Sequence, residues 1–293
     1  MTTYLPRIKA RVTIHAHRRV VGLLEGEYAS TQLGRSMDFH DLREYVRGDD
    51  VKDIDWKATA RTGQLLVKRF TATRQHLVVV AVSTGRSMSA QLTTSASKRD
   101  LAVFVSGVVG WLAVRHGDTV AIAHGDAEHR HLRKAADTEV ALEHGLAAIH
   151  EAITPMAPAT DLLGLLRYVA RTVRRRAILV IVSDSHAVDD ELATALRRLA
   201  VQHEVLFVTL DDLDPTLDAG RRGIVEVSTG RRLPVWLRDQ RLAEEYAAFA
   251  AAEDARMREV LDGLAIAYER VRDEASALTA VFRLLERHRH GRH

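Results

Sequence analysis

Leu77-Val-Val-Val-Ala-Val-Ser83, followed by Thr84-Gly85-Arg86-Ser87, is the stretch that says most about this chain. Six apolar residues stand in a row, and four of them are valine. A strand with one face in water alternates apolar and polar residues, whereas a strand buried on both faces does not. The run therefore predicts a central strand of a parallel sheet, and we expect Val79 and Val80 to be inaccessible together.

Helical and strand patterns alternate in the sequence that follows this run. The patterns predict helices over 97–115, 138–152, 161–174 and 189–200, and strands over 119–123, 177–183 and 204–210. This order predicts an α/β fold with a doubly wound, mostly parallel sheet. Ligands of such sheets collect at the carboxyl ends of strands near a switch in strand order. Here those ends are Ser83–Ser87 and Ser183-Asp184-Ser185.

The flanking segments give weaker patterns. Before the central run we expect a helix over 8–24, a turn-rich polar region over 27–63 and a short strand over 65–70 that pairs with the sheet or with a late hairpin. After residue 210 we expect that hairpin (224–227 and 232–236) and two helices (240–261 and 274–287). The predicted domains are an N-terminal segment (1–76), an α/β domain (77–212) and a C-terminal part packed on it (213–293).

Composition excludes several classes of protein. The 293 residues are 46% hydrophobic and 28% charged, which is typical of a folded chain with a sizeable core. The absence of cysteine excludes disulfide frameworks, thiolate metal sites and cysteine nucleophiles. The first residues lack the apolar segment of a secretory signal, and the longest uncharged stretch, 101–114, is too short to span a membrane. We therefore expect a cytoplasmic protein without membrane insertion.

Charge is concentrated in blocks near the N-terminus. Residues 1–76 carry 14 basic and 9 acidic residues, against 28 and 30 in the rest of the chain. Seven acids and three bases lie between Asp38 and Asp55, and basic blocks stand on both sides. This order favours internal ion pairs over a continuous nucleic-acid-binding stripe. We expect side-chain hydrogen bonds from Asp55, from Arg61 and from Asp49 or Asp50.

Residues 34–70 also carry a recognisable pattern. It reads Gly34-Arg-Ser-Met-Asp38-Phe39, Leu42-Arg43-Glu44-Tyr45, Gly48-Asp49-Asp50, Asp53-Ile-Asp55-Trp56, Ala60-Arg61 and Lys68-Arg69-Phe70. This pattern closely resembles the signature of the DUF58 family, bacterial proteins commonly linked with MoxR-type AAA+ ATPases. The resemblance implies a von Willebrand factor A-like domain after the signature. It also implies a partner surface among Asp38, Arg43, Tyr45, Gly48, Asp49, Asp50, Asp53, Asp55, Trp56 and Arg61, although a tryptophan such as Trp56 more often serves packing.

The same resemblance implies where a metal would bind. In A-type domains the strand-end loop reads Asp-x-Ser-x-Ser, and a Thr and an Asp from two further loops complete a divalent-cation site. Here Ser83 and Gly85 replace the first Asp and the first Ser, while Ser87, Thr160 and Asp184 remain as candidates. Mg²⁺ prefers several oxygen ligands that include carboxylates. We therefore expect a degenerate site that binds Mg²⁺ weakly, if at all, through Ser87, Thr160 and Asp184, and no other cofactor.

Enzyme motifs are absent from the sequence. It has no nucleophile elbow, no phosphate loop and no zinc signature, and the spacing of His129 and His131 is typical of an exposed hairpin although His124 lies close by. The family resemblance implies a non-enzymatic adaptor that acts with a MoxR-type AAA+ ATPase on a client protein. Two alternatives stay open: a metal- or phosphate-dependent enzyme that uses the strand-end site, and a nucleic-acid-associated protein that uses the basic N-terminus.

Overall fold

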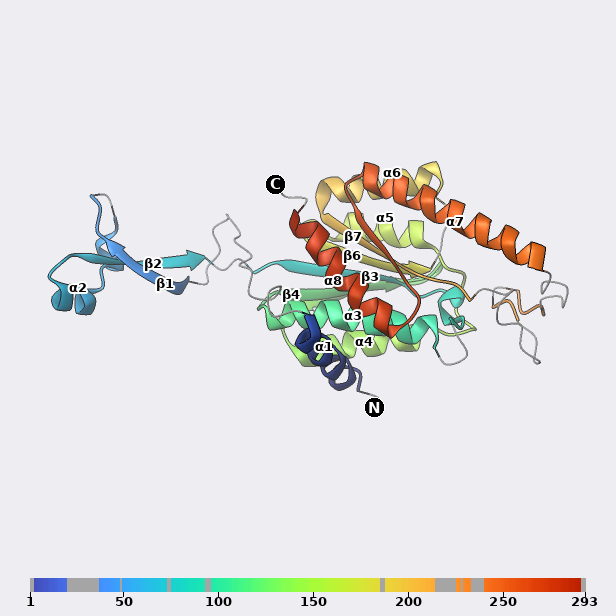
Figure 1. Ribbon diagram of the computed structural model, residues 1–293, viewed down its shortest axis with the longest axis horizontal. Helices are drawn as coiled ribbons and strands as arrows, with labels where there is room; N and C mark the ends of the chain where they lie inside the picture. The colour runs from blue at the N-terminus through green and yellow to red at the C-terminus, as the bar shows by residue number, and fades with distance from the viewer. Residues whose placement is uncertain are drawn as a thin grey trace. The chain divides into compact units, whose positions relative to one another are not determined.

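The computed structural model describes residues 3–19, 37–47, 49–72, 75–92, 96–184, 188–213, 225–227, 229–232 and 240–290. The chain forms two compact units (Figure 1). The larger unit contains Met1–Arg19 and His76–His293, and the smaller contains Val20–Gln75. The first nineteen residues thus belong with the sheet that follows the signature segment, and not with the signature segment itself.

A six-stranded sheet forms the centre of the larger unit, in the order β5-β4-β3-β6-β7-β8. Five strands are parallel, and β5 at one edge runs antiparallel to β4. Val79 and Val80 are fully buried, so the predicted central strand and the mostly parallel sheet are confirmed. The strands are β3 (Leu77–Ser83), β4 (Thr119–Gly125), β5 (Arg130–Ala136), β6 (Ile178–Asp184), β7 (Glu204–Leu210) and β8 (Ala267–Val271).

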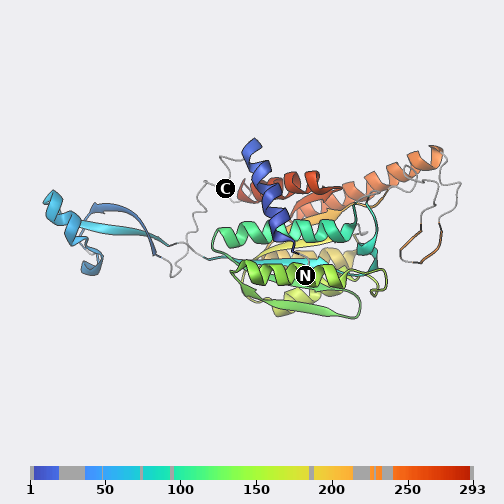
Figure 2. The ribbon, with the colours of Figure 1, turned by 90° about the horizontal axis from the view of Figure 1, so that it is seen from below.

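Helices cover both faces of this sheet (Figures 1 and 2). On one face lie α3 (Lys98–Arg115) and α4 (Glu139–Ala152), with α1 (Leu5–Arg19) and α8 (Glu274–His290) packed against α3. On the other face lie α5 (Leu162–Thr172), α6 (Asp190–Gln202) and α7 (Gln240–Gly263). Helix α3 is buried continuously from Leu101 to Ala113, and a helix that is apolar all round needs such neighbours on every side.

The smaller unit is a hairpin-like pair of strands with helical turns between them. Strand β1 (Met37–Glu44) runs antiparallel to β2 (Leu66–Ala72), and η1 (Val51–Asp53) and α2 (Trp56–Thr62) connect them. Asp55 caps α2 by accepting hydrogen bonds from the backbone N–H groups of Lys57 and Ala58. Gly63 ends the helix at φ 74°, a left-handed conformation that glycine adopts without strain.

Three sequence-based predictions need correction. The region 27–63 contains a strand and a helix, which escaped notice because β1 is rich in charged residues and α2 is only seven residues long. The strand predicted over 65–70 exists, but it pairs with β1 and not with the central sheet. The short strand β8 was not predicted, because its sequence Ala-Tyr-Glu-Arg-Val shows no strong pattern between two helices.

Parts of two further predictions lie outside the described residues. The expected N-terminal helix is present as far as Arg19, and residues 20–24 are not described. In the expected late hairpin, Val225 and Arg232 form an antiparallel bridge, while residues 224 and 233–236 are not described. Among the described helices, none combines the length and the apolar character that crossing a bilayer requires.

Candidate functional site

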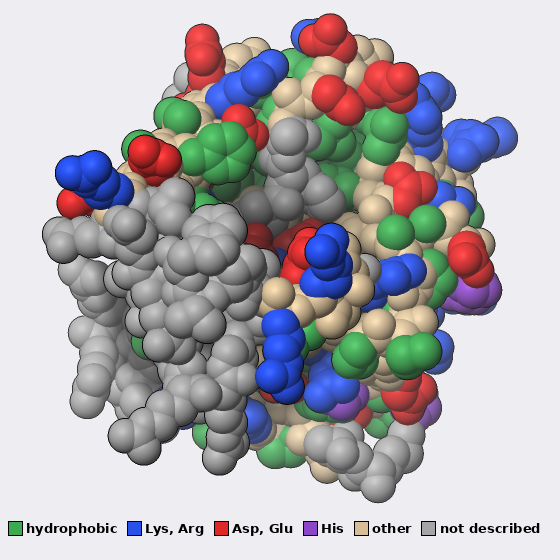
Figure 3. Space-filling model, turned by 90° about the vertical axis from the view of Figure 1, so that its right-hand side faces the viewer, with side chains coloured by type: hydrophobic (Ala, Val, Ile, Leu, Met, Phe, Trp, Pro, Cys, Tyr) green, Lys and Arg blue, Asp and Glu red, His purple; other side chains and the backbone are tan. Residues whose placement is uncertain are grey.

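The candidate site lies where β3 and β6 end. These neighbouring strands mark the point at which the chain changes direction through the sheet, since β4 and β5 lie on one side of the pair and β7 and β8 on the other. Ligand sites of doubly wound sheets occupy such a position. Figure 3 shows this end of the larger unit, where Lys and Arg side chains stand beside Asp and Glu side chains.

The hydroxyl groups at this edge bond to one another. Ser183 at the end of β6 donates to the Oγ of Ser83 at the end of β3 over 2.8 Å, and both residues are fully buried. Ser87, in the η2 turn (Arg86–Ser89), is hydrogen-bonded to the hydroxyl of Thr160, just before α5. A hydroxyl that is already bonded to another side chain has fewer lone pairs left for a ligand.

Gly85 holds the strand-end loop close to the segment that contains Thr160. A Cβ atom at Gly85 would overlap the backbone N and Cα of Thr160 as well as its hydroxyl oxygen. The backbone N–H of Arg86 also donates to the carbonyl of Pro158 over 2.8 Å. The space in which a serine side chain would stand is therefore filled by backbone, so Gly85 is required for this packing.

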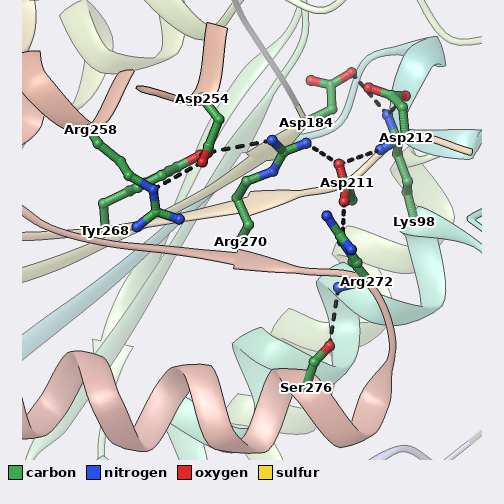
Figure 4. A network of polar contacts seen from close by, with 10 residues as sticks. All are labelled: Lys98, Asp184, Asp211, Asp212, Asp254, Arg258, Tyr268, Arg270, Arg272 and Ser276. Carbon is green, nitrogen blue, oxygen red and sulfur yellow. Dashed lines mark hydrogen bonds and ion pairs between the residues drawn. The ribbon is translucent and has the colours of Figure 1, made fainter. Parts of the chain in front are cut away.

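Asp184 faces a lysine that sequence reasoning did not single out. Lys98 is the first residue of α3, its side chain is 1% exposed, and its Nζ lies 3.8 Å from Oδ2 of Asp184. The same ammonium forms an ion pair with Asp212, which follows β7 (Figure 4). A buried ammonium is strongly destabilising unless carboxylates compensate it. The charge of Asp184 is therefore balanced within the protein.

A second set of ion pairs continues from this lysine to the edge of the sheet (Figure 4). Asp211, beside Asp212, pairs with Arg270 and accepts a 2.6 Å hydrogen bond from Nε of Arg272. Arg270 also lies 3.4 Å from Asp254 on α7. The network ties β7, β8 and α7 together where β7 and β8 end.

Asp254 is held ionised by its neighbours. Burial opposes its charge, but hydrogen bonds from Tyr268 (2.8 Å) and Arg258 (2.9 Å) outweigh burial and lower the pKa of the carboxyl. Burial also raises the pKa of the Tyr268 phenol, and the adjacent carboxylate adds to the effect. The phenol therefore stays protonated and acts as a donor, which fits a structural role for this part of the network.

The residues at the strand ends do not fit a resident Mg²⁺ ion. Among the predicted ligands Asp184 is the one carboxylate and pairs with Lys98, while the hydroxyls of Ser87 and Thr160 bond to each other. Mg²⁺ takes near-octahedral oxygen ligands, and one or two carboxylates must be available to bind it. Across the described part of the chain, no group of three or more His, Asp or Glu side chains is arranged to hold a metal.

The signature residues form a separate set in the smaller unit. Arg43 donates two hydrogen bonds to Asp49, from Nη1 to Oδ2 (2.8 Å) and from Nη2 to Oδ1 (2.6 Å). The hydrogen bond from Arg43, joined by one from the backbone of Val46, lowers the pKa of the Asp49 carboxyl. Asp50 caps η1 and Asp55 caps α2. The predicted hydrogen bonds of Asp55 and of the Asp49–Asp50 pair are confirmed.

Other signature residues behave differently. Arg61 is exposed in the last turn of α2, and its predicted hydrogen bond is not found within the described residues. Trp56 is 62% exposed, so it is not a core residue, although tryptophan more often serves packing. Asp53 lies in η1 and Tyr45 directly follows β1, both partly exposed. Gly48 and the side chain of Asp38 lie outside the described part of the structure.

Four exposed apolar side chains lie in the segment that joins the end of β1 to the start of β2. The backbone N–H of Tyr45 donates to the carbonyl of Leu65 over 2.8 Å, which brings Val46 beside Leu65. The backbone N–H of Asp55 donates to the carbonyl of Leu66 over 2.8 Å, which brings Trp56 to the same place. Together with Val51, these residues are 47–62% exposed. We call Val46, Val51, Trp56 and Leu65 the apolar patch.

The fold and the site define an α/β protein whose strand-end residues are neutralised internally and whose signature segment forms a unit of its own. Residues 41–256 match the family described as "Protein of unknown function DUF58". The chain belongs to this family. It is 29% identical over 291 residues to uncharacterized proteins of Mycobacterium tuberculosis and Mycobacterium bovis, and the match covers 94% of this chain and 86% of theirs.

Solved structures are similar at low sequence identity. The conserved hypothetical protein BatB from Bacteroides thetaiotaomicron is 14% identical with a TM-score of 0.47, over 73% of this chain and 99% of that one. An aerotolerance-related membrane protein from Bacteroides fragilis gives the same identity and TM-score, over 72% and 98%. A von Willebrand factor type A protein from Catenulispora acidiphila is 12% identical with a TM-score of 0.43, over 75% and 44%.

Proposed function

We propose that this protein is a non-enzymatic adaptor that acts with a MoxR-type AAA+ ATPase in the maturation or remodelling of a client protein. Family membership and the signature over 34–70 support the partner, because the resemblance implies this association. The observation that carries the proposal is the apolar patch, which stands on the small unit that holds the signature.

The apolar patch has the composition of a protein-binding surface. Tryptophan is enriched among the residues that dominate binding energy at protein interfaces, and here Trp56 is 62% exposed beside exposed aliphatic side chains. Contiguous exposed apolar surface that is bordered by charges is typical of interaction sites. The border here includes the Arg43–Asp49 ion pair, which holds the backbone of Val46 through a 2.9 Å hydrogen bond to Asp49.

The two alternatives receive less support. An enzyme that uses the strand ends would need free ligands or nucleophiles, whereas Ser83 bonds to Ser183, and Ser87 bonds to Thr160. A nucleic-acid-binding unit would need unpaired cations, whereas the smaller unit mixes acids and bases and pairs Arg43 with Asp49. Turnover that is lost in Asp184→Ala would favour the enzyme, and a salt-dependent DNA shift would favour nucleic-acid binding.

Co-purification with a tagged MoxR-type ATPase from the same genome tests the adaptor proposal. The double variant Val46→Ser/Trp56→Ala should lose association while its melting temperature stays unchanged, because both side chains are exposed. The matched control is Val201→Ser, since Val201 is 80% exposed on α6 of the larger unit. Association that survives the double variant, or that is lost equally in the control, would contradict the proposal.

A further inference from the structure

A groove runs between α4 and the edge strand β5, away from the strand-end site. Its volume is about 820 Å³, which is within the range of small-molecule sites. Helix α4 lines it with small residues, Ala141, Gly145 and Ala148. Ile122 of β4 packs against Gly145, where a Cβ atom would overlap the end of its side chain. These small residues leave space beside the longer Leu142, His144 and Glu151 side chains of the same helix.

The rim of the groove is basic. His131 and Arg133 of β5 pair in register with His124 and Ile122 of β4, so they project from the sheet on the side that faces α4. Lys134 also lines the groove, and Glu151 is the one acidic residue among its described lining. Neither Arg133 nor Lys134 has a carboxylate partner within the described residues, whereas the neighbouring Arg130 pairs with Asp161.

His124 adds a polar side chain to the lining of the groove. The residue is 8% exposed and lines the groove, and its ring nitrogens make no hydrogen bond with the described part of the chain. Its ring centroid lies 5.3 Å from that of His131. The ring nitrogens of His124 are not fully enclosed by the protein, so a ligand in the groove can form hydrogen bonds with them.

The protonation state of His124 fits this role. Burial lowers its pKa to about 4, and the nearby His131 and Arg133 act in the same direction. The ring is therefore neutral at physiological pH, with one N–H donor and one acceptor nitrogen. It can hydrogen-bond a polar ligand while Arg133 and Lys134 supply the positive charge.

We propose that this groove binds a small organic anion that carries phosphate groups. The apolar floor of Val120 and Ile122 contacts the body of the ligand, and Arg133, whose planar fork matches phosphate oxygens, contacts its charge together with Lys134 and His131. A phosphate group with about two charges matches two unpaired cations better than a single carboxylate does. The proposal is independent of the adaptor role, because it uses a different part of the larger unit.

Isothermal titration of the full chain with ADP, in the absence of divalent cations, tests the proposal. Adenosine and pyrophosphate, which are the two halves of the probe, should each bind more weakly than ADP. Arg133→Ala should weaken ADP binding by about tenfold or more, because it removes charge-assisted hydrogen bonds. Arg133→Lys should retain part of the affinity, and His124→Asn should weaken binding with the fold intact by circular dichroism.

Arg198→Ala provides the charge-matched control, since Arg198 is exposed on α6 and does not line the groove. An equal loss of affinity in Arg198→Ala and Arg133→Ala would show non-specific charge attraction and overturn the proposal. Absence of binding by all three probes at about 5 mM would also overturn it. Displacement of ADP by a hexaglutamate peptide that itself binds more tightly would assign the groove to an acidic peptide instead.

Discussion

The strand-end site and the signature unit both contain paired charges, but they place them in opposite environments. At the strand ends Lys98 is 1% exposed and pairs with Asp184 and Asp212, which are far away in sequence. In the signature unit Arg43 is 36% exposed and pairs with Asp49, six residues away. The first arrangement balances a buried charge and closes a site, whereas the second orders a loop and leaves apolar side chains exposed.

The largest difference between the two regions should appear when the cation of each is removed. Lys98→Met leaves the buried carboxylate of Asp184 without its ammonium, so we expect the free energy of unfolding of the larger unit to fall by about 3 to 5 kcal/mol. Arg43→Met removes a solvent-exposed pair, so its effect on the free energy of unfolding should be much smaller. Urea denaturation of both variants measures the difference. Equal and small effects would show that Lys98 is not a buried structural cation.

The pH dependence of stability provides a second comparison, between His124 of the larger unit and Asp49 of the signature unit. Burial lowers the pKa of His124 to about 4. His131 and Arg133 of β5 also lower it, whereas Asp126, which follows β4, raises it, and His144 of α4 lines the same groove. The unfolded chain takes up this proton below the ordinary pKa of 6.5. Stability therefore falls as pH drops from about 6.5 to 4, by about 3 kcal/mol from this group.

His124→Gln removes this contribution, so its stability should decline less than that of the wild type across the same pH range. Denaturant midpoints at pH 7, 5.5 and 4 check the result. Asp49 loses its contribution in the same direction but at lower pH, because the hydrogen bond from Arg43 lowers its pKa and the contribution disappears only as pH falls below the ordinary carboxyl range. Parallel pH profiles of wild type and His124→Gln would contradict the assignment.

A smaller effect is expected within the signature unit. Asp55→Ala removes the side chain that caps α2 through two 3.0 Å hydrogen bonds and should destabilise the helix by about 1 kcal/mol. Faster amide exchange in α2, with unchanged exchange in α3, measures it. Asp55→Asn should keep most of the protection, because asparagine caps nearly as well. Global unfolding in Asp55→Ala would show that this residue does more than cap a helix.

Sequence reasoning recovered the features that depend on neighbours along the chain. The apolar run from Leu77 to Ser83 predicted the central strand, and Asp161 and Asp189 stand at the N-caps of helices that were predicted to begin there. It also placed the candidate site at the correct edge of the sheet. It missed Lys98, since 114 residues separate it from Asp212. The pair Asp211-Asp212 directly after β7 was a usable signal, because it stands at a third strand end.

The central claim is that the strand ends of this chain are neutralised internally and do not form a working metal site. The melting temperature in about 10 mM Mg²⁺, compared with that in chelator, tests it most directly. A ligand stabilises by RT ln(1 + [L]/Kd), so a site without free carboxylates should give a shift of less than about 1 °C. A reproducible rise of several degrees that is lost in Asp184→Ala would contradict the claim.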